Sequence, residues 1–177
     1  MSAPHESLRI ARVASPLGAL LAVHDAAGDL CALDFADREP RLRRLLRGYF
    51  GPEGERPAPG LAPARLVDSL DAYFAGDLRA LDAVPLRTHG TGFQRRVWST
   101  LREIPAGATT SYGALARTLG CPGACRAVGR ANGANPIAIV VPCHRVVGAD
   151  GELTGYAGGL ARKRWLLEHE NRWRHCA

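Results

Sequence analysis

The sequence lacks a long hydrophobic run. Its opening, "MSAPHESLRIARVASPLG", is interrupted by charges and prolines, and no later segment is apolar over the roughly 20 residues that a membrane helix needs. Signal peptides and membrane spans are therefore excluded, and we expect a cytoplasmic protein with no membrane partner. The sequence also lacks low-complexity tracts. With 177 residues, of which 46% are hydrophobic, it can bury a core as one compact unit or as two small lobes.

The cysteine pattern of a disulfide framework is also missing. An odd number of cysteines in an intracellular chain predicts free thiols. No Cys or His pair completes a structural zinc site around Cys121 and Cys125, and His89 is isolated in a linker. We therefore expect neither a metal nor another cofactor. The five cysteines are Cys31, Cys121, Cys125, Cys143 and Cys176.

Lysine is almost absent. The chain has 23 basic residues and a formal net charge of +6, yet Lys163 is its only lysine. The positive balance favours a polyanionic partner such as nucleic acid, although many basic proteins have none. Lys163 and Glu170 stand seven residues apart in the last predicted helix, so they share one face about two turns apart. We expect Lys163 to lie near whatever site Glu170 serves.

The first half of the chain predicts a small sheet followed by two helices. The short apolar runs "LRIARVA", "GALLAVHD" and "LCALDFA" are separated by the turn signals "SPLG" and "AAGD", which is typical of an antiparallel meander. The segment "RLRRLLRGYF" predicts a helix, "GPEGERPAPGLAP" a loop, and "ARLVDSLDAYFAGD" an amphipathic helix that ends at Gly76. A linker is expected over residues 77–90.

The second half predicts a helical lobe. Apolar residues recur at helical spacing in "GFQRRVWSTLREIP" until Pro105 ends the helix. The segment "SYGALARTLG", with Ser111 as N-cap and Gly120 as its end, is joined by the turn "CPG" to "ACRAVGRANGAN", and this order indicates helix-turn-helix. The second of these helices is rich in small residues. They favour either tight packing against another helix or close approach to DNA, with Arg126 projecting into the base stack.

The stretch "IAIVVPCHRVVG" contains the candidate reactive residues. Because Pro142 has no N–H to donate to a sheet, we expect the strand "IAIVV" to end there and to leave Cys143 exposed at the end of the strand. Neighbouring side chains of an extended chain point in opposite directions, so His144 is expected to take the thiol proton through a bridging water. His144 also needs an orienting carboxylate, for which Glu168 and Glu170 are the candidates.

Several of these segments together resemble a known family. The stretches "GTGFQRRVWSTLREIPAGATTSYGALA", "RAVGRANGANPIAIVVPCHRVVG" and "GELTGYAGGLARKRWLLEHE" are similar to the 6-O-alkylguanine-DNA alkyltransferases, the methylated-DNA–protein-cysteine methyltransferases of the bacterial Ogt type. The first half resembles them mainly in "SPLGALLAV" and "DAYFAGD". The resemblance implies an α/β (α+β) fold, with a ribonuclease-H-like small sheet lobe over residues 1–85 and a helical, winged helix-turn-helix lobe over residues 86–177.

The resemblance also implies roles for individual residues. Cys143 would accept the alkyl group, His144 would act as the base through water, and Glu170 would orient and charge His144. Asn135 would be the hinge between the recognition helix and the cysteine segment, and Tyr112 would help to rotate the nucleotide and bind its base. Lys163 completes the catalytic set. The expected contacts to substrate and DNA are Arg126, which fills the gap left by the extruded nucleotide, and Ala127, Gly129, Arg145, Tyr156, Ala157 and Gly158.

These assignments predict a monomeric DNA-repair protein. It would bind double-stranded DNA that carries alkylated guanine or thymine, flip the nucleotide, and transfer the alkyl group irreversibly, once per molecule, to its own cysteine. Two other classes of protein fit the sequence less well. A non-catalytic reader of alkylated bases would lack the cysteine that Cys143 supplies, and a thiol hydrolase would need an oxyanion hole that the motif does not offer.

Overall fold

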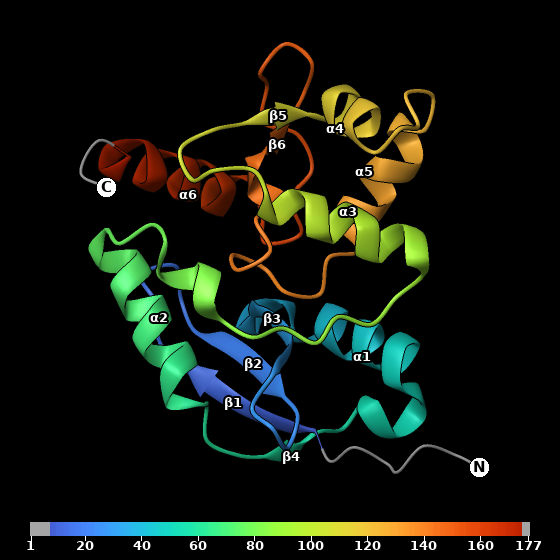
Figure 1. Cartoon of the computed structure of the whole chain (residues 1–177). Coiled ribbons are helices and arrows are strands. Elements are labelled where there is room, and N and C mark those ends of the chain that lie inside the picture. The colour runs from blue at the N-terminus through green and yellow to red at the C-terminus, as the bar shows by residue number, and fades with distance from the viewer. Residues whose placement is uncertain (1–7, 175–177) are drawn as a thin grey trace.

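The computed structural model describes residues 8–174, which form a sheet-based lobe and a helical lobe (Figure 1). This mixed α/β architecture confirms the predicted fold class. The sheet-based lobe consists of β1 (Arg9–Val13), β2 (Leu20–His24), β3 (Leu30–Phe35), the 3-10 turn η1 (Ala36–Arg38), α1 (Glu39–Gly54), β4 (Ala58–Pro59), α2 (Ala64–Ala75) and the 3-10 turn η2 (Ala80–Ala83). The helical lobe consists of α3 (Gly92–Arg102), β5 (Thr110–Ser111), α4 (Tyr112–Thr118), α5 (Cys125–Gly133), the 3-10 turn η3 (Cys143–Arg145), β6 (Val146–Val147) and α6 (Leu160–Trp173).

The predicted meander is confirmed. β1, β2 and β3 pair antiparallel in the order of the chain. In the second turn, the Asp25 carboxylate accepts the amides of Ala27 and Asp29, and Gly28 adopts a φ of 85° that few other residues tolerate. The turn residues thus specify the hairpin that brings β3 beside β2.

The two faces of this sheet are buried by different partners. Because successive strand residues point to opposite faces, Leu21 and Val23 pack with α1, whereas Leu20 and Ala22 pack with α2 and with the helical lobe. The apolar cluster that includes Leu20 and Ala22 runs continuously from β2 through Trp98 to Leu166. The two lobes therefore share one hydrophobic core, and the division at residues 85 and 86 stays a prediction.

Two segments predicted to be irregular contain structure. The loop "GPEGERPAPGLAP" includes the end of α1, broken at Gly51, and the short strand β4, which pairs parallel with β1 at the sheet edge. Pro59 is tolerated there because an edge strand leaves its outer side unpaired. The linker 77–90 contains η2, and Leu86 forms an isolated bridge with Leu30. Both predictions were wrong in part because pairing with a distant strand is not visible in local composition.

The helices of the second lobe begin and end where the sequence indicated. Thr91 and Gln94 form a reciprocal capping box at the start of α3, and the Ser111 hydroxyl accepts the Ala114 amide at the start of α4. Trp98 of α3 donates its indole N–H to the carbonyl of Ala131 at 2.8 Å, which fixes α5 against α3. The helix-turn-helix order is confirmed, and no helix within residues 8–174 has the length and apolar character of a membrane span.

The strand predicted over residues 137–141 is wrong. Ile137 makes a single bridge to Leu33, after which the chain turns, and Ile139 has a φ of 70°. The cause is Asn135. Its side chain accepts the Ile137 amide at 3.0 Å and donates to the Val141 carbonyl at 2.9 Å, which folds the segment back on itself. The apolar run was misread because a buried turn and a buried strand share the same composition.

Candidate active site

Cys143 lies in a cavity between the two lobes. It begins η3 and is 6% exposed, so the expected position at an exposed strand mouth is wrong: the turn after Asn135 carries the thiol inward. The cavity has a volume of about 270 Å³. The sequence-predicted residues that line it with Cys143 are Tyr112, Gly129, Asn135, Tyr156, Ala157 and Gly158, and the first lobe adds Asp34 and Arg41.

His144 contacts Glu170 beneath Cys143. Both side chains are fully buried, and Nε2 of His144 lies 2.8 Å from Oε1 of Glu170. Because an ionised carboxylate only accepts hydrogen bonds, Nε2 carries the proton, and Nδ1 of a neutral ring is then an acceptor. Nδ1 has no protein partner within the described part of the chain. The geometry selects Glu170 as the partner of His144, since Glu168 is exposed on the opposite side of α6.

Burial and hydrogen bonding set the charges in this group. Burial raises the pKa of the Cys143 thiol, an effect that contact with Asn135 and the charges of Arg41 and Lys163 only reduce. Burial also lowers the pKa of His144, although Glu170 opposes the shift. Burial alone would raise the pKa of Glu170, but His144 and Arg145 hold that pKa far below its usual range. The resting site therefore contains a thiol, a neutral imidazole and a carboxylate.

Arg145 is buried against Glu170, contrary to the sequence-based expectation that it contacts substrate or DNA. Its Nε and Nη2 donate to the Glu170 carboxylate at 3.0 and 2.8 Å, and its Nη1 donates to the Ile104 carbonyl at 2.6 Å. The side chain is 8% exposed. The planar guanidinium can bind both oxygens of a carboxylate at once, as it does here with Glu170. The position of Arg145 in the sequence, two residues after Cys143, did not indicate this buried partner.

Lys163 of α6 is also buried, and it contacts β6. Its ammonium donates to the carbonyls of Val146 and Thr154, both at 2.6 Å, and burial lowers its pKa. These bonds hold β6 to the loop that precedes Tyr156. Lys163 is not one of the residues that line the cavity, but its positive charge favours a lower pKa of the Cys143 thiol.

The loop over the cavity is closely packed. A side chain at Gly158 would place its Cβ 2.5 Å from the Phe35 ring and 2.6 Å from the Tyr156 ring, so only glycine fits. Tyr156 stands edge-on to His144 at 6.5 Å, and its hydroxyl has no hydrogen-bond partner among the described residues. Tyr112, at the start of α4, also lines the cavity and is half-buried. Two tyrosines thus face the space beside the thiol.

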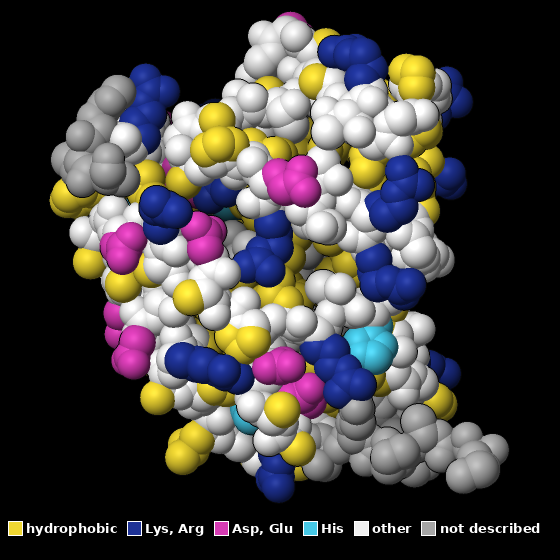
Figure 2. Space-filling view, viewed as in Figure 1, with side chains coloured by type: hydrophobic (Ala, Val, Ile, Leu, Met, Phe, Trp, Pro, Cys, Tyr) yellow, Lys and Arg dark blue, Asp and Glu magenta, His cyan; other side chains and the backbone are white. Residues whose placement is uncertain are grey.

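The helix α5 presents small residues between the cavity and the exterior. Gly129 lines the cavity, Ala127 is half-buried, and Arg126 is exposed. Figure 2 shows arginine side chains on the outside of the helical lobe, along the side that carries α3, α4 and α5. The small residues therefore leave the thiol within reach of a group that approaches along α5. The roles assigned to Arg126, Ala127 and Gly129 stay predictions.

Sequence reasoning missed three contributors from outside the motif. Tyr73 of α2 donates its hydroxyl to Glu170 at 2.8 Å, and the Gly107 amide donates to the same carboxylate at 3.1 Å. Arg41 of α1 pairs with the buried Asp34 and donates to the Gly133 and Asn135 carbonyls. The "DAYFAGD" resemblance marked the segment of Tyr73, whereas Arg41 is one of many arginines in its helix.

Some regions carry no candidate site. Within residues 8–174, no cluster of three or more histidine, cysteine or acidic side chains has the geometry to hold a metal. Cys31 is buried in the sheet-based lobe, Cys121 and Cys125 flank the turn before α5, and Cys176 lies outside the described residues.

Two family models match the chain in succession. The model described as 6-O-methylguanine DNA methyltransferase, ribonuclease-like domain, matches residues 8–88, and the DNA binding domain of the same description matches residues 92–172. A methylated-DNA–protein-cysteine methyltransferase of Shigella flexneri is 50% identical over 159 residues, covering 90% of this chain and 93% of that protein. Its counterpart in Mycobacterium tuberculosis is 61% identical over 129 residues, covering 72% and 77%.

Solved structures agree with these sequence matches. The crystal structure of Mycobacterium tuberculosis O6-methylguanine methyltransferase superposes with a TM-score of 0.75 at 44% identity, covering 94% of each chain. A second crystal structure, of the Mycobacterium tuberculosis protein in complex with DNA, has the same TM-score of 0.75 at 43% identity and covers 93% of this chain and 92% of that one.

Proposed function

Because the chain belongs to the 6-O-methylguanine-DNA methyltransferase family, we propose that it repairs alkylated DNA by moving the alkyl group from 6-O-alkylguanine to the sulfur of Cys143. One observation carries this proposal: a buried thiol lines a cavity next to a histidine–carboxylate pair, directly beside the small-residue helix of a helix-turn-helix. The thiol supplies the acceptor, the pair supplies a base, and the helix supplies access for DNA.

The proton of Cys143 leaves through His144. Nδ1 of the neutral ring accepts it through a bridging water, while Nε2 keeps its hydrogen bond to Glu170 and so stabilises the imidazolium that forms. The thiolate then attacks the alkyl carbon. A sulfur–carbon bond forms, the bond between that carbon and O6 of guanine breaks, and the guanine takes up a proton. Overall, the thiol proton moves to the guanine and the alkyl group moves to sulfur.

Attack at a saturated carbon explains why so few groups are needed. No tetrahedral intermediate forms, so the reaction requires no oxyanion hole. The product is a thioether, which is a poor leaving group, and no second nucleophile among the residues that line the cavity is placed to remove it. Each molecule is therefore expected to act once. Tyr112 and Tyr156 line the same space, and a tyrosine hydroxyl is suited to bind the base.

The substrate nucleotide must leave the duplex before it reacts. A base inside the stack cannot reach a thiol that is 6% exposed, whereas a flipped nucleotide can enter the cavity past Gly129. Ala127 and Gly129 permit close approach of the backbone, and the exposed Arg126 is placed to fill the gap in the stack. Unpairing costs least for a damaged base, which adds selectivity. We also propose 4-O-alkylthymine as a second substrate, and we expect a cytoplasmic monomer.

Intact-mass measurement tests this proposal. The chain is incubated with an excess of duplex that contains one 6-O-methylguanine, and peptide mapping then locates the added group. We expect one methyl group per molecule, on Cys143, with no further reaction after this plateau. Cys143→Ser should bind the duplex and gain no methyl, whereas Cys125→Ser, which removes the exposed cysteine of α5, should react as the unchanged chain does.

The alternatives predict different results in the same assay. A thiol hydrolase turns over acyl substrates repeatedly and leaves the methylated duplex untouched. A non-catalytic reader binds the duplex and gains no mass. Either result would overturn the proposed transfer.

A further inference from the structure

Glu170 receives hydrogen bonds from both lobes. Its Oε1 accepts Nε2 of His144 and the Tyr73 hydroxyl, each at 2.8 Å, and also Nη2 of Arg145 at 2.8 Å. Its Oε2 accepts Nε of Arg145 at 3.0 Å and the Gly107 amide at 3.1 Å. Among these donors, Tyr73 alone belongs to the sheet-based lobe, 97 residues away from Glu170 in the chain. Among the described residues, the first lobe thus contacts the Glu170 carboxylate through the Tyr73 hydroxyl.

Tyr73 is firmly held where it meets α6. Its side chain is fully buried, its backbone carbonyl lies 2.9 Å from Nε2 of His169, and the Tyr73 and His169 rings are 5.2 Å apart. Burial, together with the charge of Glu170, keeps the pKa of the phenol well above its usual range. The hydroxyl therefore retains its proton and acts as a donor to Glu170 throughout the neutral range.

A shared carboxylate attracts an imidazolium less strongly. The Tyr73 hydroxyl and His144 donate to the same oxygen, so the negative charge available to His144 is smaller than it would be without Tyr73. Arg145 and the Gly107 amide hold the carboxylate in place from the other side, so Tyr73 is not needed to keep it from rotating. What Tyr73 adds is a limit on the basicity of His144.

We propose that Tyr73 is a positioning residue of the reaction centre that keeps Cys143 in its thiol form at rest, by drawing part of the charge of Glu170 away from His144. The inference rests on the proposed function, in which each molecule reacts once. Oxidants and unrelated electrophiles attack thiolates much faster than thiols. A resting thiolate would therefore be consumed without any repair of DNA, and the hydroxyl from the first lobe reduces this loss.

Several other side chains surround the pair of His144 and Glu170, and their contacts do not involve the Tyr73 hydroxyl. Lys163 interacts with both His144 and Cys143, Tyr156 faces His144 edge-on, and the stem of Arg174 packs over Gly107. These side chains stay in place when only the Tyr73 oxygen is removed. The titratable or charged groups around Glu170 and His144 are Tyr73 from α2, Cys143 and Arg145 from η3, Tyr156 from the loop, Lys163 and His169 from α6, and Arg174 beyond it.

Tyr73→Phe tests the proposal, because it deletes one oxygen and keeps the ring. The rate at which iodoacetamide alkylates Cys143 is followed against pH by mass spectrometry of the Cys143 peptide, without DNA. We expect the midpoint to fall by about half a pH unit, so that alkylation below the midpoint is about threefold faster. Transfer from the free base 6-O-benzylguanine should accelerate over the same pH range. A role in packing alone would not make the thiol more reactive.

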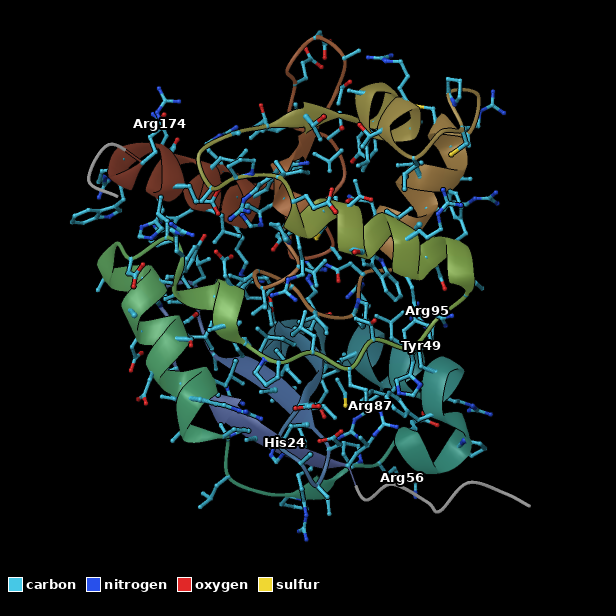
Figure 3. The ribbon with its side chains drawn as sticks, in the orientation of Figure 1. His24, Tyr49, Arg56, Arg87, Arg95 and Arg174 are labelled. Atoms are coloured by element: carbon cyan, nitrogen blue, oxygen red, sulfur yellow. The ribbon has the colours of Figure 1, made fainter. Side chains whose placement is uncertain are left out.

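Three controls accompany this variant. Tyr49→Phe removes another hydroxyl that joins the lobes, since Tyr49 lies on α1 facing α3 and donates to the Ala134 carbonyl at 3.0 Å (Figure 3). It should leave the midpoint unchanged. Slow alkylation of the buried Cys31 in the same digest shows that each variant is folded. In a Glu170→Gln background, where there is no charge to share, Tyr73→Phe should no longer move the midpoint.

The proposal is overturned if Tyr73→Phe, with Cys31 still protected, leaves the midpoint where it was or raises it. Failure of the proposed function has a different signature, namely no methyl transfer from DNA to Cys143 in the unchanged chain. Since iodoacetamide needs no DNA, the two results are independent.

Discussion

The side chains beneath Cys143 and those on α5 are held in opposite ways. His144 and Glu170 are fully buried and fixed by hydrogen bonds from η3, α2 and the loop at Gly107, whereas Arg126 and Arg130 stand exposed on a helix of small residues. A buried group acts on any electrophile that enters the cavity. An exposed one acts only when a duplex lies against the helix. Under the proposed function, this difference separates the side chains that serve chemistry from those that serve recognition.

The largest effect is expected from the buried region, with Glu170→Gln. Loss of the carboxylate charge makes His144 a weaker base, so transfer should slow by about 100-fold for free base and duplex alike. The rate profile should move to higher pH, because the thiolate is less favoured. Rates measured against pH with both substrates check this, with Glu168→Gln, an exposed change on the same helix, as the control. An unchanged profile would remove Glu170 from the proton path.

The same variant should also lose stability. Arg145 would keep a buried charge without its partner, which costs about 3 kcal/mol of the free energy of unfolding, so a protein of ordinary stability stays folded. In the unchanged chain the pKa of Glu170 is lowered on folding, so its contribution is present above its ordinary pKa of about 4.3 and is lost as the pH falls further. Urea unfolding should therefore give a lower free energy of unfolding at acid pH than at neutral pH. This difference between the two pH values should be smaller in Glu170→Gln.

A smaller and more selective effect is expected from the exposed region, with Arg126→Ala. Transfer from the duplex should slow by about tenfold, because the gap left by the flipped nucleotide is no longer filled. Transfer from 6-O-benzylguanine should be unchanged, because a free base needs no wedge. The ratio of the two rates is the measurement, and Arg130→Ala, an exposed arginine on the same helix, is the control. Equal losses on both substrates would erase the distinction between the two regions.

The smallest effect is expected from Lys163→Arg. The ammonium fits between the Val146 and Thr154 carbonyls at 2.6 Å from each, and the larger planar guanidinium cannot keep both contacts. The shift of β6 and the loop should slow transfer by about threefold to fivefold with both substrates. Affinity for undamaged DNA should stay the same, as should all properties of the neighbouring exposed variant Arg164→Lys. Wild-type rates would show that the single lysine has no special role.

Much of the helical lobe was predictable because its signals are local. The capping hydroxyl of Ser111, the end at Gly120 and the apolar spacing of α3 each lie within one or two turns of the structure they specify. The same holds for the meander and its turns. Segments whose structure depends on a distant partner were misread, as in the case of β4, which forms only because β1 lies beside it.

The candidate site was predictable in its members but not in their contacts. The motif resemblance identified Cys143, His144 and Glu170, and their mutual geometry is consistent with the assigned roles. It placed Arg145 among the contacts to substrate and DNA. In the fold, the fixed direction of η3 points that side chain at Glu170 instead. Adjacent residues in a turn share no simple rule for where their side chains go.

The sequence by itself determined the meander, the main helices, the thiol and the family, because periodicity, caps and the order of short motifs are properties of neighbouring residues. The tertiary structure alone decided how buried Cys143 is, why residues 137–141 turn at Asn135, and which donors surround Glu170. Tyr73 meets Glu170 across 97 residues of chain. Such a contact follows from how two lobes pack over one core, and that packing depends on the shapes of all the buried side chains together.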